Sequence, residues 1–218
     1  MERAEALGRE RVLARIRSAL KAPAPHHQCA SPSGPVFVPL ANAVERFQRE
    51  CAANSTELIL VPDTRGAADA LGMVLASVTP GEIYLQDAPP LRRMLGGLKT
   101  DRAVRWSNDG PPSESSQAAI TAVECLVAAT GSIFIASSAA GRGASVVAPV
   151  HIVVASEAQL EPDLAAALRR VKDRELTTHN SALFLITGSS RTADIEKILV
   201  LGAHGPRRVV VILARNLD

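Results

Sequence analysis

The chain has 218 residues, of which 47% are hydrophobic and 3% aromatic, and its 24 basic and 22 acidic residues give a net charge of +2. This near balance argues against a dedicated polyanion binder, and so few aromatic side chains offer little to stack on the bases of single-stranded nucleic acid. A core built from Ala, Val, Leu and Ile is typical of α/β proteins with buried parallel strands, so we expect that fold class and no nucleic-acid partner.

The cysteines give no sign of a metal or cluster site. Cys29, Cys51 and Cys125 are far apart and no CxxC pair occurs, so we expect neither structural zinc nor an iron–sulfur centre, and no other cofactor. An odd, sparse set of cysteines fits the reducing cytoplasm, where we expect the protein. The N-terminal segment carries both charge signs without a signal-peptide core, and no run of about 18 apolar residues predicts a membrane span.

Residues 2–21 are predicted to form a helix with a narrow apolar stripe of Leu13, Ile16 and Leu20. This stripe could dock on the chain's own domain or on a partner subunit, and both alternatives stay open. A Pro/Ser-rich loop follows at residues 22–35 and sets the first 36 residues apart from a domain over residues 37–218. The adjacent His26 and His27 in this loop make a poor chelate alone, so no metal site is expected.

Helices and strands alternate over the next seventy residues. We predict helices at 41–52, 65–77 and 90–98, and strands at 58–61, 82–85 and 103–106. Such alternation predicts a mostly parallel sheet with right-handed crossovers, flanked by helices, in a single domain.

The second half begins with a loop at 107–116 and an apolar stretch, Ala118 to Ala136, interrupted by Thr130-Gly131-Ser132. We interpret it as two strands that meet in a hairpin near Thr130-Gly131. A small-residue loop (137–149), a strand (151–154) and a helix (160–174) with Pro162 and Asp163 in its first turn follow. The closing unit is predicted as a strand at 182–186, a polar loop, a helix of about ten residues and a strand at 209–213.

The polar loop Gly188 to Thr192 is the first candidate site, because open parallel sheets bind ligands beyond the carboxyl ends of their strands. Ser189, Ser190 and Thr192 offer hydroxyl and backbone donors, and Arg191 offers a fork for phosphate or carboxylate. Helix capping by Ser190 or Thr192, with Arg191 paired to Asp194, explains the same residues without a ligand.

His204-Gly205-Pro206 follows the predicted helix. If the flanking strands are parallel, His204 lies at the opposite sheet edge from Ser190, with about 15 Å of helix between them. We therefore favour a structural role for His204 in a tight turn, and one site that uses both segments would need a neighbouring subunit or an antiparallel final strand. His204 and Asp194 remain candidate ligand-binding residues beside the polar loop.

Three further positions carry candidate chemistry. Glu124, in the apolar hairpin, either faces solvent or is a buried carboxylate with a partner, and in the second case it is a functional candidate. Arg142, in Gly141-Arg142-Gly143, has the composition of a phosphate-approach loop but also of a plain loop. His151 is expected to be a packed, hydrogen-bonded histidine.

These motifs resemble the LUD-domain family, in its LutC/YkgG lactate-utilisation branch. The N-terminal RVLARIRSAL is similar to that family's opening helix, and Thr121 to Ser132 to its hairpin motif. The segment from Gly141-Arg142-Gly143 to Pro149-Val150-His151-Ile152 is similar to its GRG…PVHI segment. The run SRTADIE from Ser190, with His204-Gly205-Pro206, is close to its SRTADIE…HGP signature.

The chain departs from the family pattern in the hairpin. Ala129 stands where the family usually has Glu, Glu124 where Asp is usual, and Ser132 where Thr is usual. The missing Glu puts in doubt a catalytic role for the hairpin, unless Glu124 compensates. Glu124 remains the candidate catalytic residue, and Thr130 and Gly131 remain candidate ligand-binding residues.

The resemblance implies an α/β fold like the NagB/RpiA/CoA-transferase group. It also implies a subunit without a redox centre in a system that oxidises L-lactate to pyruvate, with the iron–sulfur clusters held by partner subunits. The alternatives are a stand-alone enzyme of the CoA-transferase or folate cyclo-ligase type, a protein that binds a small carboxylate or phosphate, and a structural interaction module. Self-association is left open.

Overall fold

The computed structural model describes residues 2–21, 40–95, 100–137, 143–174, 180, 182–192, 200–201 and 205–217. The chain divides into two compact units, residues 1–36 and 37–218. The first contains helix α1 (Glu2–Ala19), at the position where the sequence predicts a helix. The predicted metal-free loop with His26 and His27 lies outside the described residues, as do Arg142, Asp194 and His204.

A parallel sheet of six strands forms the centre of the second unit. All its neighbouring strands pair in parallel. In spatial order they are β1 (Thr56–Val61), β12 (Arg208–Ala214), β7 (Val150–Ser156), β4 (Ser116–Ala122), β2 (Glu82–Leu85) and β3 (Val104–Trp106). This arrangement confirms the mostly parallel α/β domain predicted from the alternation of helices and strands.

Helix starts follow the capping residues of the sequence. Helix α2 (Ala43–Ala53) begins after Asn42, whose side chain accepts from two backbone N–H groups, and α3 (Thr64–Ala76) begins after Asp63, whose side chain accepts from one. These side chains satisfy donors that a helix start would leave without partners. A shorter helix, α4 (Pro89–Leu95), and a 3₁₀ turn (Ser107–Asp109) lie in the connections around β3.

The second sheet has four strands, in the order β8 (Leu160–Glu161), β5 (Cys125–Val127), β6 (Ser132–Ala136) and β9 (Leu183–Ile186). Strands β5 and β6 pair antiparallel and form the hairpin expected near Thr130-Gly131. A 3₁₀ turn (Glu157–Gln159) precedes β8, and helix α6 (Leu164–Asp173) follows Asp163, which caps it. The predicted helix at 160–174 therefore begins four residues later than expected, because Leu160 and Glu161 pair with β5.

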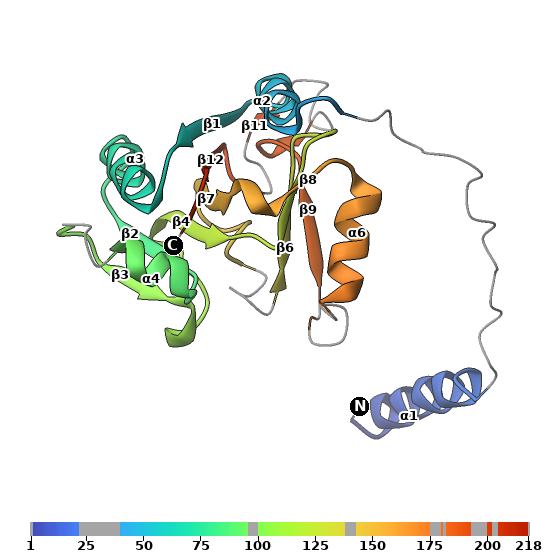
Figure 1. Ribbon diagram of the computed structural model, residues 1–218. Coiled ribbons are helices and arrows are strands. Elements are labelled where there is room, and N and C mark those ends of the chain that lie inside the picture. The colour runs from blue at the N-terminus through green and yellow to red at the C-terminus, as the bar shows by residue number, and fades with distance from the viewer. Residues whose placement is uncertain are drawn as a thin grey trace. The chain divides into compact units, whose positions relative to one another are not determined.

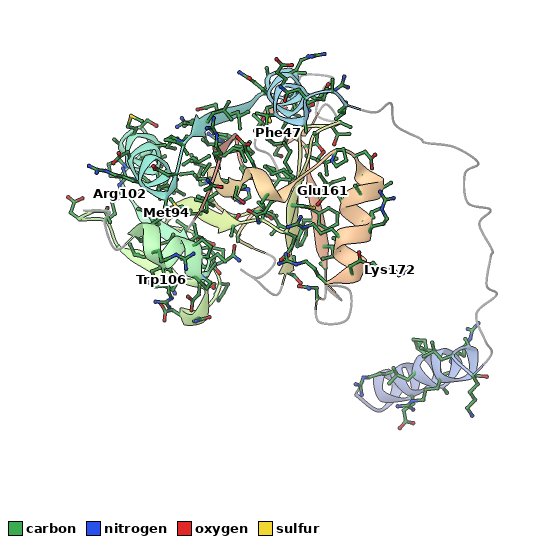
Figure 2. All side chains as sticks on the ribbon, in the orientation of Figure 1. Phe47, Met94, Arg102, Trp106, Glu161 and Lys172 are labelled. Carbon is green, nitrogen blue, oxygen red and sulfur yellow. The ribbon has the colours of Figure 1, made fainter. Side chains whose placement is uncertain are left out.

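Two hydrophobic cores lie on opposite faces of the parallel sheet. One contains apolar side chains of α3 and α4, and the other fills the space between the parallel sheet, α2 and the second sheet. Figure 1 shows α3 and α4 on one side of the strands β4, β7 and β12, and the second sheet with α6 on the other. Figure 2 labels Phe47 on α2 and Met94 on α4, two buried side chains that belong to the two cores.

The closing unit of the prediction is wrong in two respects. Strand β9 does not join the parallel sheet but pairs antiparallel with β6 at the edge of the second sheet. In addition, β10 (Arg191–Thr192) pairs antiparallel with β11 (Val200–Leu201), so the predicted helix cannot include Val200 and Leu201. Most of its other positions, residues 193–199, lie outside the described part of the chain.

Candidate functional site

The tip of the β5–β6 hairpin packs against the last turn of α2. The Asn54 side-chain amide donates to the Thr130 carbonyl oxygen over 3.0 Å. Gly131 has a φ of +65°, and a Cβ there would lie 2.8 Å from the backbone carbonyl carbon of Glu50. Since L residues rarely adopt this conformation and no side chain fits this space, the contact between hairpin and helix requires glycine at this position.

The loop after β9 reaches the same helix end. Gly188 has a φ of +79°, and a Cβ there would lie 2.3 Å from the Asn54 carbonyl oxygen. Thr130 Oγ1 and Ser132 Oγ are 2.7 Å apart, and Ser132 Oγ lies 2.7 Å from Thr187 Oγ1. This hydroxyl chain joins the hairpin tip to the end of β9, so the two predicted motifs share one place in the fold.

Ser190 lies beside Gly205-Pro206, contrary to the expected separation of these segments by a helix of about 15 Å. The Ser190 N–H donates to the Pro206 carbonyl oxygen over 2.9 Å, and a Cβ on Gly205 would lie 3.1 Å from Ser190 Cβ. Because β10 and β11 pair antiparallel, the chain turns back toward Ser190 before it reaches Gly205, which explains why the two segments are close. Ser189, next to it, is buried.

Arg191 binds the end of α2. Its side chain is exposed, and one of its terminal nitrogens donates to the Asn54 carbonyl oxygen over 2.5 Å. Asn54 is the C-cap of α2. Because the C-terminal end of a helix carries partial negative charge, the guanidinium is favourably placed there. One N–H group of the guanidinium is therefore used by the helix end, and the remaining N–H groups are available to an anion.

We name these segments the α2-end junction: Asn54, Thr130–Ser132, Thr187–Arg191 and Gly205-Pro206. Asn54 lies two residues before Thr56, where β1 begins, and Pro206 lies two residues before Arg208, where β12 begins. The junction therefore lies at the amino edge of the parallel sheet. The expectation that the loop Gly188 to Thr192 follows a strand of this sheet at its carboxyl edge is wrong, because β9 belongs to the second sheet.

A carboxylate lies near the hairpin tip although residue 129 is an alanine. Arg46 of α2 lies 3.5 Å from the Ala129 carbonyl oxygen and forms an ion pair with Glu50 at 2.9 Å. Glu50 also contacts Gly131 through its backbone. The acidic group beside the tip thus comes from α2 and not from the hairpin.

Glu124 lies away from the junction. It stands before β5, whereas Thr130 follows β5, so the length of this strand separates them. Its side chain is 17% exposed and pairs at 3.2 Å with Arg174, whose side chain is 53% exposed. Glu124 therefore lies between the two alternatives, with a partner but only partly buried, and it is not brought together with the serines.

His151 is fully buried, and its Nε2 lies 2.9 Å from Thr121 Oγ1. Burial lowers the pKa of its imidazole to about 4. It is therefore neutral near pH 7 and packed within the sheet, as its position at the start of a strand suggested.

Sequence reasoning missed Asn54 and Thr187 as members of the junction. Asn54 contacts both motifs, through its side chain and its carbonyl oxygen. The residue after it, Ser55, has a φ of +58°, which a non-glycine residue rarely adopts. An Asn-Ser pair between a helix and a strand suggests a turn, but nothing local identifies its distant partners.

Within the described ranges, no group of three or more His, Cys, Asp or Glu side chains could hold a metal ion. Nor is any helix in that part of the chain long and apolar enough to cross a membrane.

The family model of the LUD domain matches residues 41–214. The chain is 27% identical over 188 residues to lactate utilization protein C of Bacillus subtilis (strain 168), covering 78% of this chain and 77% of that protein. Identity to the protein of the same name from Bacillus velezensis is also 27%, over 191 residues, which are 79% of this chain and 78% of that one. A crystal structure of a DUF162 family protein from Deinococcus radiodurans superposes with a TM-score of 0.63 at 20% identity, over 81% of this chain and 99% of that one, and supports the fold.

Proposed function

The chain belongs to the LUD-domain family, and from this membership we propose that it works in lactate utilisation, as a subunit without a redox centre in a system that oxidises L-lactate to pyruvate. The observation that carries the proposal is the similarity over more than three quarters of the chain to relatives named lactate utilization protein C. The oxidation releases two electrons and two protons. In the proposal, cytoplasmic partner subunits with iron–sulfur clusters accept the electrons.

Within this role, the α2-end junction is the proposed contact for a small carboxylate. Arg191 is exposed, and its bond to Asn54 uses one of five guanidinium N–H groups. A lactate or pyruvate carboxylate could accept from the remaining fork, with the partly exposed Ser190 next to Arg191 in the chain. The negative end of α2 opposes an anion here, so this proposal implies weak, millimolar-range binding by the isolated chain.

Growth on lactate tests the role. In a host whose own copy of this gene is deleted, we expect growth on glucose but not on L-lactate, and rescue by the wild-type chain. Arg191→Ala should rescue less well than Arg207→Ala, a matched change of an arginine that is also exposed at the amino edge of the sheet. Normal growth of the deletion strain on lactate would remove the proposal.

A thermal-shift series tests the ligand separately. With a millimolar dissociation constant, a ligand at about ten times that concentration stabilises the folded state by about 1.4 kcal/mol, which for a domain of this size raises the midpoint by about 3–6 °C. Lactate, pyruvate, inorganic phosphate and an acyl-CoA are the compounds to compare, with Arg191→Ala beside the wild type. A shift that survives in Arg191→Ala would place the ligand elsewhere.

One observation favours the alternative, an enzyme of the CoA-transferase or folate cyclo-ligase type. The partly buried Glu124, paired with Arg174, is a carboxylate that can act as nucleophile or acid/base. Glu124→Gln keeps the shape of this side chain and removes its charge. Full rescue of growth on lactate by Glu124→Gln would exclude a catalytic role for this carboxylate in lactate utilisation.

A further inference from the structure

Helix α1 carries its apolar and basic side chains in an ordered pattern over its C-terminal half. At 3.6 residues per turn, five apolar side chains in residues 12–20 share an arc of about 120°. They are Val12, Leu13, Ile16, Ala19 and Leu20. In the first unit, Val12 is 57%, Ile16 49% and Leu20 78% exposed. Hydrogen bonding continues the helical turn to Leu20, whose N–H donates to the Ile16 carbonyl oxygen over 2.9 Å.

Every charged residue in the same half is basic. Arg15 and Arg17 border the apolar arc on its two sides, and Arg11 and Lys21 lie further round the helix. No acidic residue occurs between positions 11 and 21. The long stems of these side chains can extend along an apolar surface while their charges stay in water.

The pattern disfavours a second copy of α1 as the cover of this arc. Arg9 occupies the same side of the helix, so the apolar arc ends there. Two copies could bury their arcs only by aligning their C-terminal halves, which would bring eight positive charges together. Like charges along the borders of a helix pair oppose pairing.

We propose that the C-terminal half of α1 binds an anionic lipid surface, lying in the plane of the headgroups with the Val12–Leu20 arc in the acyl boundary. A short amphipathic helix with apolar side chains on one face and Lys or Arg beside them has the chemistry of an interfacial helix. Basic residues on both borders of the arc meet a flat negative surface equally, and no acidic residue between positions 11 and 21 opposes that contact. The proposal concerns a different part of the chain from the α2-end junction and does not depend on the function proposed there.

Co-sedimentation of the full chain with vesicles tests the proposal. We expect the chain to bind vesicles of phosphatidylglycerol and phosphatidylcholine, and to stay in solution with phosphatidylcholine alone. Binding should fall as salt rises, because the charges are exposed. Ile16→Asp places a charge in the apolar arc and should abolish binding.

The double variant Arg15→Gln and Arg17→Gln should bind about 30-fold more weakly, since each basic residue near an anionic surface contributes about fivefold. Its matched control is Arg65→Gln with Arg169→Gln, which removes the same charge from exposed positions on α3 and α6. Equal binding by the two double variants, binding to neutral vesicles, or no binding to anionic vesicles would overturn the proposal. So would a dimer in solution that Ile16→Asp converts to monomers, since a second copy would then cover the arc.

Discussion

The buried imidazole of His151 should make the stability of the domain depend on pH between about 4 and 6.5. The side chain is fully buried on β7, with Nε2 at 2.9 Å from Thr121 Oγ1. Among the described residues, Nδ1 has no hydrogen-bond partner. Burial is the cause that lowers the pKa of this group to about 4, because a charged imidazolium loses its hydration there.

The sign and size follow from proton linkage. An unfolded histidine has a pKa near 6.5, so between pH 6.5 and 4 the unfolded chain binds a proton that the folded chain does not. Stability is therefore complete above about pH 6.5 and falls as the solution is acidified toward pH 4. With about 1.4 kcal/mol for each pH unit, His151 alone accounts for a loss of about 3 kcal/mol.

Urea unfolding of the wild type and of His151→Gln, from pH 4 to pH 8, measures this contribution. A glutamine amide can occupy the place of Nε2 near Thr121 but does not titrate in this range. The hydrogen bond from Arg208 lowers the pKa of Glu57, and that from Ser113 lowers the pKa of Glu82. Both carboxylates contribute equally to the pH dependence of the wild type and of His151→Gln, so their contributions cancel when one unfolding free energy is subtracted from the other. Parallel curves of unfolding free energy against pH would refute the assignment of a neutral, buried His151.

Two further changes test the α2-end junction by urea unfolding. Gly188→Ala should cost about 3 kcal/mol, because it adds the strain of a positive φ, about 1–2 kcal/mol, to an overlap with the Asn54 carbonyl oxygen. A loss no larger than the strain alone would mean that the loop after β9 does not contact α2 as described. Ser132→Ala removes the hydroxyl that contacts both Thr130 and Thr187, and should lower the free energy of unfolding by about 1–2 kcal/mol. An unchanged urea midpoint would show that these hydroxyls bond water instead.

The local sequence was sufficient to predict most of the parallel half of the domain. The strand around Leu58–Val61 and the helix after Asp63 come from an apolar run and a capping side chain, which are local signals. The Thr130-Gly131 turn was also predicted correctly, because a glycine between two apolar runs marks a hairpin.

The local sequence could not predict which sheet a strand joins. Residues Leu183 to Ile186 have the apolar composition of a strand in the parallel sheet, yet β9 is an edge strand whose Leu185 is 44% exposed. The neighbour of β9 is β6, some fifty residues earlier, and no feature within either strand encodes that pairing. Since the candidate site depends on this pairing, its residues could be named from the sequence, but its position at the amino edge could not.

At the carboxyl edge, where open parallel sheets usually bind ligands, this protein's own side chains close the place between β2 and β4. The chain leaves β2 toward the face covered by α4 and leaves β4 toward the second sheet, so a crevice is expected between the ends of these two strands. There the buried Gln86 accepts from the Ala122 N–H over 2.8 Å, and Gln159 donates to the Val123 carbonyl oxygen over 2.6 Å. These two amides use the backbone groups that a ligand would otherwise bind. A ligand between the ends of β2 and β4 would have to displace both, whereas the carboxyl ends of β1, β12 and β7 line an open cavity of about 480 Å³ with Arg215 in its wall.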